Sequence, residues 1–165
     1  MKKGYALLLI VVMACGPGKT NSPLHAVSLS GDCPKQATCT IELMANKRML
    51  VETTTNGMKY TLADRTGMNV IIYKYNKIVK GNIQDAGYRE EIIFEYDGKR
   101  GAKRQDAQPQ NNKMLFGRFC FCEGQTGYFP VSNGTLLADT AGNVQLNWTV
   151  TEVPQVIKEI TFAVK

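Results

Sequence analysis

The chain is poor in the residues on which most nucleophilic and metal sites depend. Its 165 residues include a single histidine, His25, and Ser132 is the only serine beyond Ser30. It contains no G-x-S-x-G turn, Walker loop, EF-hand loop or dinucleotide-binding fingerprint. Zinc sites take about four ligands, so one histidine does not favour zinc. These absences argue against a serine nucleophile and a zinc centre, whereas a carboxylate-dependent hydrolase stays open because its residues converge only in space.

The chain also lacks an apolar run long enough to cross a membrane as a helix. Such a span needs about twenty apolar residues, and the run from Tyr5 to Ala14 stops well short of that, before Gly16-Pro17-Gly18. Lys2 and Lys3 precede the run, and a small residue followed by Cys15 ends it. This order of a basic start, a short apolar stretch and a small residue predicts a secretory signal peptide.

The end of this segment, Val12-Met13-Ala14-Cys15, resembles the lipobox of bacterial lipoproteins, in which an aliphatic, a variable and a small residue precede a cysteine. The resemblance implies cleavage before Cys15, acylation of Cys15, and attachment to a membrane of the bacterial envelope, with the outer membrane as the expected location. More than one acyl chain is sufficient for stable anchoring. A plain signal peptide with an incidental Cys15 is the alternative.

Composition divides the chain into three parts. We expect a signal peptide over 1–14, a lipidated cysteine and flexible tether over 15–23, and a single domain over 24–165, because 16–23 carries no large apolar residue. The formal charge of +6 is mild and forms no stripe, so nucleic acid is not an expected partner. In leader, tether and β-rich body the chain is similar to small lipoproteins of Bacteroidetes-type bacteria, a likeness that transfers no functional residue.

From Ala26 onward the pattern is that of β-strands. Apolar and polar residues alternate over many short windows, most cleanly at Val144, Leu146, Trp148 and Val150, so we expect Trp148 to be buried. Turn signals separate the windows, at Ala45-Asn46, Asn56-Gly57, Gly81-Asn82, Asp97-Gly98, Asn133-Gly134 and Gly142-Asn143. The pattern predicts an all-β antiparallel sandwich of about nine to ten strands, with a small β-barrel as the alternative.

Four cysteines follow Cys15, namely Cys33, Cys39, Cys120 and Cys122. An even number in an exported protein predicts two disulfides, and three connectivities are open. A local Cys33–Cys39 loop is plausible, whereas a bond between Cys120 and Cys122 within one strand would need a bulge, so crossed pairing is the alternative. The Cys-x-Cys pair also fits a soft-metal or redox-active dithiol site.

Two groups of side chains are candidate ligand contacts. The stretch 98–113 is basic and lacks large apolar residues, so we expect a long loop whose Lys99, Arg100, Lys103 and Arg104 contact anionic groups or are simply solvated. Tyr73 and Tyr75 share one face of a strand and form either a binding platform or cross-strand packing.

The neighbouring carboxylates Glu90 and Glu91 point to opposite faces of a strand, so they do not form an acid–base pair. We expect them at a solvated strand edge, with a local ion pair to Arg89.

The sequence therefore favours a lipid-anchored, non-enzymatic β-domain that binds a protein or a glycan of the envelope. The alternatives are a thiol or metal protein centred on Cys120 and Cys122, and a hydrolase with a carboxylate site. No catalytic residue, metal ligand or cofactor can be assigned from the sequence.

Overall fold

The computed structural model describes residues 26–55, 57–81, 87–99, 103–106 and 113–165, so the predicted leader, Cys15 and tether lie outside the described residues. The described residues form strands and turns, and among them no helix is long and apolar enough to cross a membrane. The ten strands are β1 (Val27–Leu29), β2 (Ala37–Thr54), β3 (Gly57–Lys77), β4 (Tyr88–Tyr96), β5 (Lys103–Asp106), β6 (Met114–Cys120), β7 (Gly127–Pro130), β8 (Asn133–Ala138), β9 (Asn143–Thr149) and β10 (Glu159–Val164).

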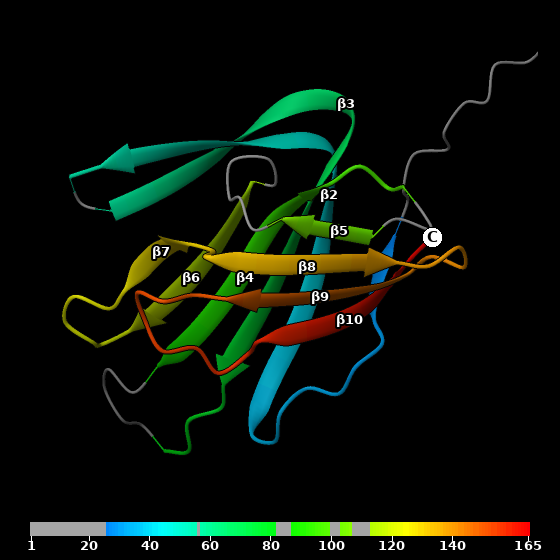
Figure 1. Cartoon of the computed structure of the whole chain (residues 1–165). Coiled ribbons are helices and arrows are strands. Elements are labelled where there is room, and N and C mark those ends of the chain that lie inside the picture. Colours follow the sequence, from blue (N-terminus) through cyan, green and yellow to red (C-terminus); the bar gives the residue numbers. More distant parts are fainter. Residues whose placement is uncertain (1–25, 56, 82–86, 100–102, 107–112) are drawn as a thin grey trace, which may run out of the picture.

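The strands form two antiparallel sheets of five, packed face to face (Figure 1). Sheet A has the order β1-β10-β9-β8-β5, and sheet B has the order β2-β3-β4-β6-β7. The chain crosses from sheet B to sheet A at β5 and returns at β6. The predicted sandwich is therefore confirmed, and the barrel alternative is not adopted.

The main core lies between the two sheets. Alternate residues of β3, β4 and β9 face inward, which buries Ile71, Phe94 and Leu146 completely or almost so. Trp148 is only 3% exposed in the same cluster, as its alternation with Leu146 predicted. Period-two burial of this kind is what fixes the register of a sheet with one covered face.

A second apolar cluster lies on the outer face of sheet B. The far half of the β2–β3 hairpin, which we call the arm (residues 47–64), folds over this face (Figure 1). Met49 of the arm is fully buried against residues of three strands of sheet B: Val70, Ile72, Ile93 and Leu115. The tip of the arm then pairs with β7 through Met58 and Tyr128. Both faces of β6 are consequently covered.

A β-bulge makes the arm bend. The β2–β3 register shifts between Ala45 and Lys47, with Asn46 at a φ of 55° and Gly67 at 77°. The amide N–H of Gly67 donates to Asn46 Oδ1 at 3.2 Å, and the N–H of Asn46 donates to Asn69 Oδ1 at 3.3 Å. Bulges bend a strand in this way and increase its twist. The turn predicted at Ala45-Asn46 is therefore wrong, because Asn46 lies within the continuous strand β2, opposite the extra residues 65–68 of β3.

Two charged side chains fasten the arm to the sheet. The N–H of Met49 donates to Glu95 Oε1 at 2.6 Å, and Lys113 Nζ donates to the carbonyl of Met49 at 2.6 Å. Lys113 and Glu95 also form an ion pair of 4.0 Å. The backbone N–H and carbonyl of the buried Met49 thus both have hydrogen-bond partners, which are side chains of the part of sheet B that the arm covers.

Two further sequence predictions need correction. Lys103–Asp106 is a strand at the edge of sheet A, paired with β8, where a structureless loop was expected. Asn133-Gly134 opens β8 and pairs with β9, so it is not the turn that the dipeptide predicted. In both places, pairing with a neighbouring strand outweighs local propensity, which is weak in sheets.

Candidate ligand-binding site at the loop end

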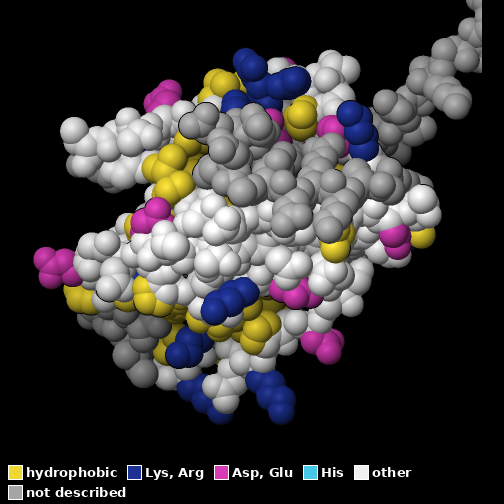
Figure 2. All heavy atoms as spheres, in the orientation of Figure 1, with side chains coloured by type: hydrophobic (Ala, Val, Ile, Leu, Met, Phe, Trp, Pro, Cys, Tyr) yellow, Lys and Arg dark blue, Asp and Glu magenta, His cyan; other side chains and the backbone are white. Residues whose placement is uncertain are grey.

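Four turns gather at one end of the sandwich, which we call the loop end: residues 31–36, 78–81, 121–126 and 150–158. They meet because the strands that they join finish at one level, with Ala37 opposite Lys77 and Tyr88 opposite Cys120. Three of the four large hydrophobic side chains that are exposed among the described residues lie here: Ile78, Phe121 and Val156. Figure 2 shows hydrophobic and basic side chains gathered in the lower part of the molecule, where Figure 1 places this end.

Both disulfides lie at the loop end. Cys33 bonds to Cys39 and Cys120 to Cys122, with Cα separations of 5.6 and 5.2 Å. The crossed pairing considered from the sequence is therefore wrong. The expected bulge is not needed either, because β6 ends at Cys120 and the chain bends at Phe121. Each bond closes a short loop, which restricts the turns at this end.

Glu90 ties the two sheets together beneath these turns. Its side chain, 1% exposed, accepts hydrogen bonds from the N–H of Val156 at 2.6 Å and the N–H of Ile157 at 2.9 Å. Its Oε1 also accepts a bond from the Tyr88 hydroxyl. A strand of sheet B thus holds the turn between β9 and β10 of sheet A. The solvated position expected for Glu90 is wrong, although its predicted orientation away from Glu91 is confirmed.

Arg118 extends this network to the turn 121–126. Its Nη1 donates to the carbonyl and to Oε1 of Gln125, at 3.1 and 2.8 Å, and its Nε donates to the Tyr88 hydroxyl at 3.4 Å. Burial, together with the hydrogen bond to Glu90, raises the pKa of Tyr88 to about 12. The turn that presents Phe121 is consequently held by a disulfide and by a buried arginine.

The first of two cavities at this end, which we call the outer hollow, has a volume of about 460 Å³. It lies against the ends of β3, β4 and β6 and is lined by Asn76, Lys77, Gly87, Tyr88, Arg89, Phe119, Cys120 and Phe121. Three of the lining residues are aromatic and two are basic. Phe121 is 84% exposed, so almost its whole ring is available for contact.

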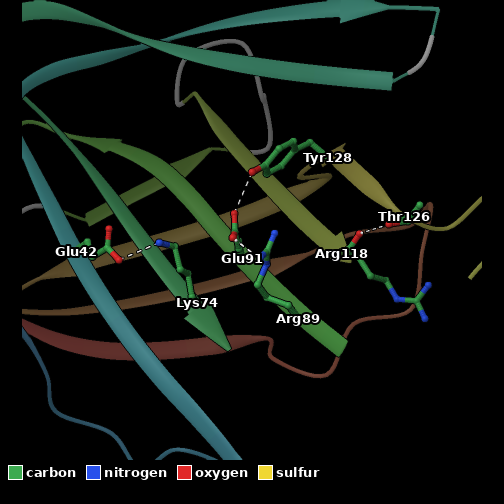
Figure 3. A network of polar contacts seen from close by, with 7 residues as sticks. All are labelled: Glu42, Lys74, Arg89, Glu91, Arg118, Thr126 and Tyr128. Atoms are coloured by element: carbon green, nitrogen blue, oxygen red, sulfur yellow. Dashed lines mark hydrogen bonds and ion pairs between the residues drawn. The ribbon is translucent and has the colours of Figure 1, made fainter. Parts of the chain in front are cut away.

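Arg89 is fixed within the lining of this hollow. Its Nε forms an ion pair with Glu91 Oε1 at 3.1 Å, and its Cζ lies 4.2 Å from the centre of the Phe119 ring. Glu91 is itself buried and accepts a bond from the Tyr128 hydroxyl at 3.0 Å. Tyr128 of β7 is thus connected through Glu91 to Arg89, the latter two both in β4 (Figure 3). Burial, then the nearby Glu91 charge, raises the pKa of Tyr128. The expected local ion pair of Arg89 is present and is made with Glu91, but Glu91 is buried where a solvated edge was expected.

The second cavity, of about 430 Å³, lies at the edge of the sandwich between the two sheets. It is lined by Leu29, Gly31, Asp32, Cys33, Pro34, Cys39, Tyr73, Val156, Ile157, Lys158, Glu159, Ile160 and Thr161. The Tyr73 hydroxyl donates to Cys39 Sγ at 3.1 Å. Burial, with a smaller effect of the Glu90 charge, raises the pKa of Tyr73 to about 12.

The predicted ligand contacts are not brought together. Lys99 is exposed, with Nζ 3.5 Å from Asp97 Oδ2, and it follows the end of β4 remote from the loop end. The backbone of Lys103 and Arg104 lies in β5, and Arg100 and Cys15 lie outside the described residues. Tyr73 and Tyr75 are buried in the main core, so the exposed platform is wrong and cross-strand packing is confirmed.

Among the described residues, no group of three or more His, Cys, Asp or Glu side chains is placed to hold a metal ion. The sequence reasoning named Arg89 and Glu90 but not the roles that they have here. The signal for Glu90 was present, since it alternates in phase with the buried Ile92 and Phe94. The partners of its carboxylate were not visible, because they lie 66 and 67 residues further along the chain.

Comparisons with known proteins identify no relative. No family model, no curated protein and no solved structure matches the chain.

Proposed function

We propose that the chain is a lipid-anchored binding domain of the bacterial envelope, and that it binds an envelope component at the loop end. The lipobox-like sequence before Cys15 supports the anchor. The exposed side chains and cavities at one end of a rigid sandwich support the binding role, because function in such folds concentrates in loops that a scaffold positions.

The position of the first strand supports a loop end that faces away from the membrane anchor. Ala26 exchanges backbone hydrogen bonds with Lys165, beyond the far end of β10, whereas Glu159 at the start of β10 lines a cavity of the loop end. The six residues of β10 span about 20 Å at roughly 3.3 Å per residue. A chain tethered before Ala26 therefore carries its loop end on the side away from the attachment.

The observation that carries the proposal is Phe121. A large hydrophobic side chain that is 84% exposed contributes nothing to the core, yet the turn holding it is fixed by the Cys120–Cys122 bond and by Arg118. A constrained hydrophobic side chain beside a cavity is typical of a contact residue.

The alternative functions have less support. A thiol or metal role for Cys120 and Cys122 requires free thiolates, and the two sulfurs are bonded to each other. A carboxylate hydrolase would need two acids that act together on one substrate. Glu90 and Glu91 face opposite sides of β4, each with its own partners, and of the two acids that line the second cavity, Asp32 and Glu159, the latter accepts a hydrogen bond from Gln145.

Co-sedimentation tests the proposal. The full chain, purified in detergent from a bacterial host that processes lipoproteins, is mixed with isolated peptidoglycan sacculi or with surface polysaccharide bound to beads. We expect one of these materials to sediment the protein saturably, and Phe121→Ser to lower the bound fraction severalfold.

Leu50→Ser is the matched control, because Leu50 is a hydrophobic residue exposed at 37% that belongs to the arm and to none of the turns of the loop end. Its bound fraction should equal that of the wild type. If neither material sediments the wild type, or if the two substitutions lower binding equally, the proposal is wrong.

A further inference from the structure

We infer that the outer hollow binds an acidic sugar residue, with Arg89 and Lys77 holding its anionic group. The inference deepens the proposed function, and it relies on that function for its biological setting. Its physical basis lies in the geometry of one arginine, in the charge of the lining and in the strands beneath the hollow.

Arg89 is held ready to bind an anion. Glu91 forms an ion pair with its guanidinium at Nε, and the Phe119 ring lies against the guanidinium. Among the described residues nothing bonds to the two terminal nitrogens, whose four N–H groups remain available as donors. The side chain is 44% exposed at the edge of the hollow. A planar fork of this kind matches the two oxygens of a carboxylate or phosphate.

The charge of the lining favours an anion. Lys77 and Arg89 contribute two positive charges, and none of the lining residues in the described part of the chain is acidic. Glu91 beneath Arg89 offsets one of these charges, which leaves the hollow positive through Lys77. No ion pair to Lys77 is found within the described part of the chain. Asn76 adds an amide that can donate to or accept from a hydroxyl group.

The strands beneath the hollow favour a small ligand over a peptide strand. Its floor is built by β3, β4 and β6, and each of these strands is paired on both sides. Because these strands are interior to sheet B, an extended peptide would find no full-length edge strand to pair with here. The volume of about 460 Å³ lies in the range of small-molecule sites. The rings of Phe119 and Phe121 give it apolar walls, which suit the carbon face of a sugar ring.

Calorimetric titration of the full chain in detergent micelles tests the inference. The probes are an oligogalacturonate, a phosphorylated monosaccharide, a neutral oligosaccharide of matched length and a poly-glutamate peptide. We expect at least one of the two acidic saccharides to bind with a dissociation constant at least about tenfold lower than that of the neutral one. A factor of this size corresponds to the loss of one charge-assisted hydrogen bond. The tighter acidic probe identifies the anion as carboxylate or phosphate. Equal binding of the neutral oligosaccharide, or binding of poly-glutamate alone, would overturn the inference.

Two variants locate the binding. Arg89→Lys keeps the charge but removes the fork, and it should weaken acidic-saccharide binding about tenfold. Arg65→Lys, the same exchange at an exposed arginine of the β2–β3 bend, should leave binding unchanged. If Arg89→Lys fails to fold, Lys77→Ala provides the test, because Lys77 is exposed and its loss should weaken binding severalfold. Unchanged binding in the folded variants refutes the site.

Failure of this inference is distinguishable from failure of the proposed function. If Arg89→Lys and Lys77→Ala leave sedimentation with envelope material intact while Phe121→Ser abolishes it, the loop end binds its partner without an anion site. If acidic saccharides bind at the hollow but no envelope material sediments the protein, the site stands and the proposed envelope partner is wrong.

Discussion

Replacing Glu90 by glutamine should destabilise the protein strongly, although the two side chains have nearly the same shape. The carboxylate is almost completely buried and accepts three hydrogen bonds, from the Tyr88 hydroxyl and from the N–H groups of Val156 and Ile157. An amide retains one acceptor oxygen and introduces an NH2 group. One of the two backbone N–H groups then faces a donor instead of an acceptor.

The magnitude follows from these contacts. A buried backbone N–H left without an acceptor costs about 1–3 kcal/mol. The remaining bonds lose their charge assistance, which costs about 1 kcal/mol each. We therefore expect Glu90→Gln to lower the free energy of unfolding by about 3–5 kcal/mol. A domain of this size has a total of roughly 5–15 kcal/mol, so the variant should lose a large share of its stability.

Urea unfolding and amide hydrogen exchange measure the effect. The control is Glu42→Gln, which removes a charge from a half-exposed side chain paired with Lys74 at 2.9 Å. Such a surface pair contributes about 0–1 kcal/mol, so the control should unfold near the wild-type midpoint. In Glu90→Gln, the amides of Val156 and Ile157 should lose protection from exchange first. If the unfolding free energy stays within about 1 kcal/mol of the wild type and both amides stay protected, Glu90 does not hold the turn as argued.

Three further predictions concern the cysteines and tyrosines. Cys15→Ala should move the protein from the detergent-soluble membrane fraction to the aqueous one, and its continued retention in membranes would contradict lipidation. The unreduced, denatured protein should show no reactive thiol at Cys33, Cys39, Cys120 or Cys122; four reactive thiols would reject the disulfides. The pKa values of Tyr73 and Tyr88, about 12 against about 10 when unfolded, should delay their ionisation in the native state, measured by absorbance at 295 nm. Because the native pKa values are the higher ones, their stabilising effect is full below pH 10 and is lost as the pH rises through 12, and titration of every tyrosine near pH 10 in the native protein would refute this.

The sequence predicts the sandwich well because strand periodicity reports directly which face is buried. Trp148 is the clearest example, since its alternation with Leu146 and Val150 placed it in the core where it lies. The same reasoning placed Glu90 and Glu91 on opposite faces of β4. Periodicity does not report what covers a face, however, so the burial of both carboxylates was missed.

The arm and β5 could not be predicted for a related reason. At Asn46 the strand bends but stays extended. The sequence of such a bend resembles that of a tight turn, so the two cannot be distinguished locally. The basic stretch that contains Lys103–Asp106 has no apolar alternation, and it is a strand because β8 offers a free edge. Both features arise from long-range pairing, which a window of a few residues does not contain.

The two neighbouring carboxylates of β4 separate the stability of this fold from its candidate site. Glu90 faces inward and joins the sheets through the turn at Val156, whereas Glu91 faces outward and orients Arg89 at the hollow. The two networks share one strand but no side chain. Changes at Glu90 should therefore act first on folding, and changes at Arg89 first on binding. A β-strand that alternates its side chains can thus carry both roles at adjacent positions, and Tyr88, which bonds to Glu90 and lines the hollow, is the point where the two meet.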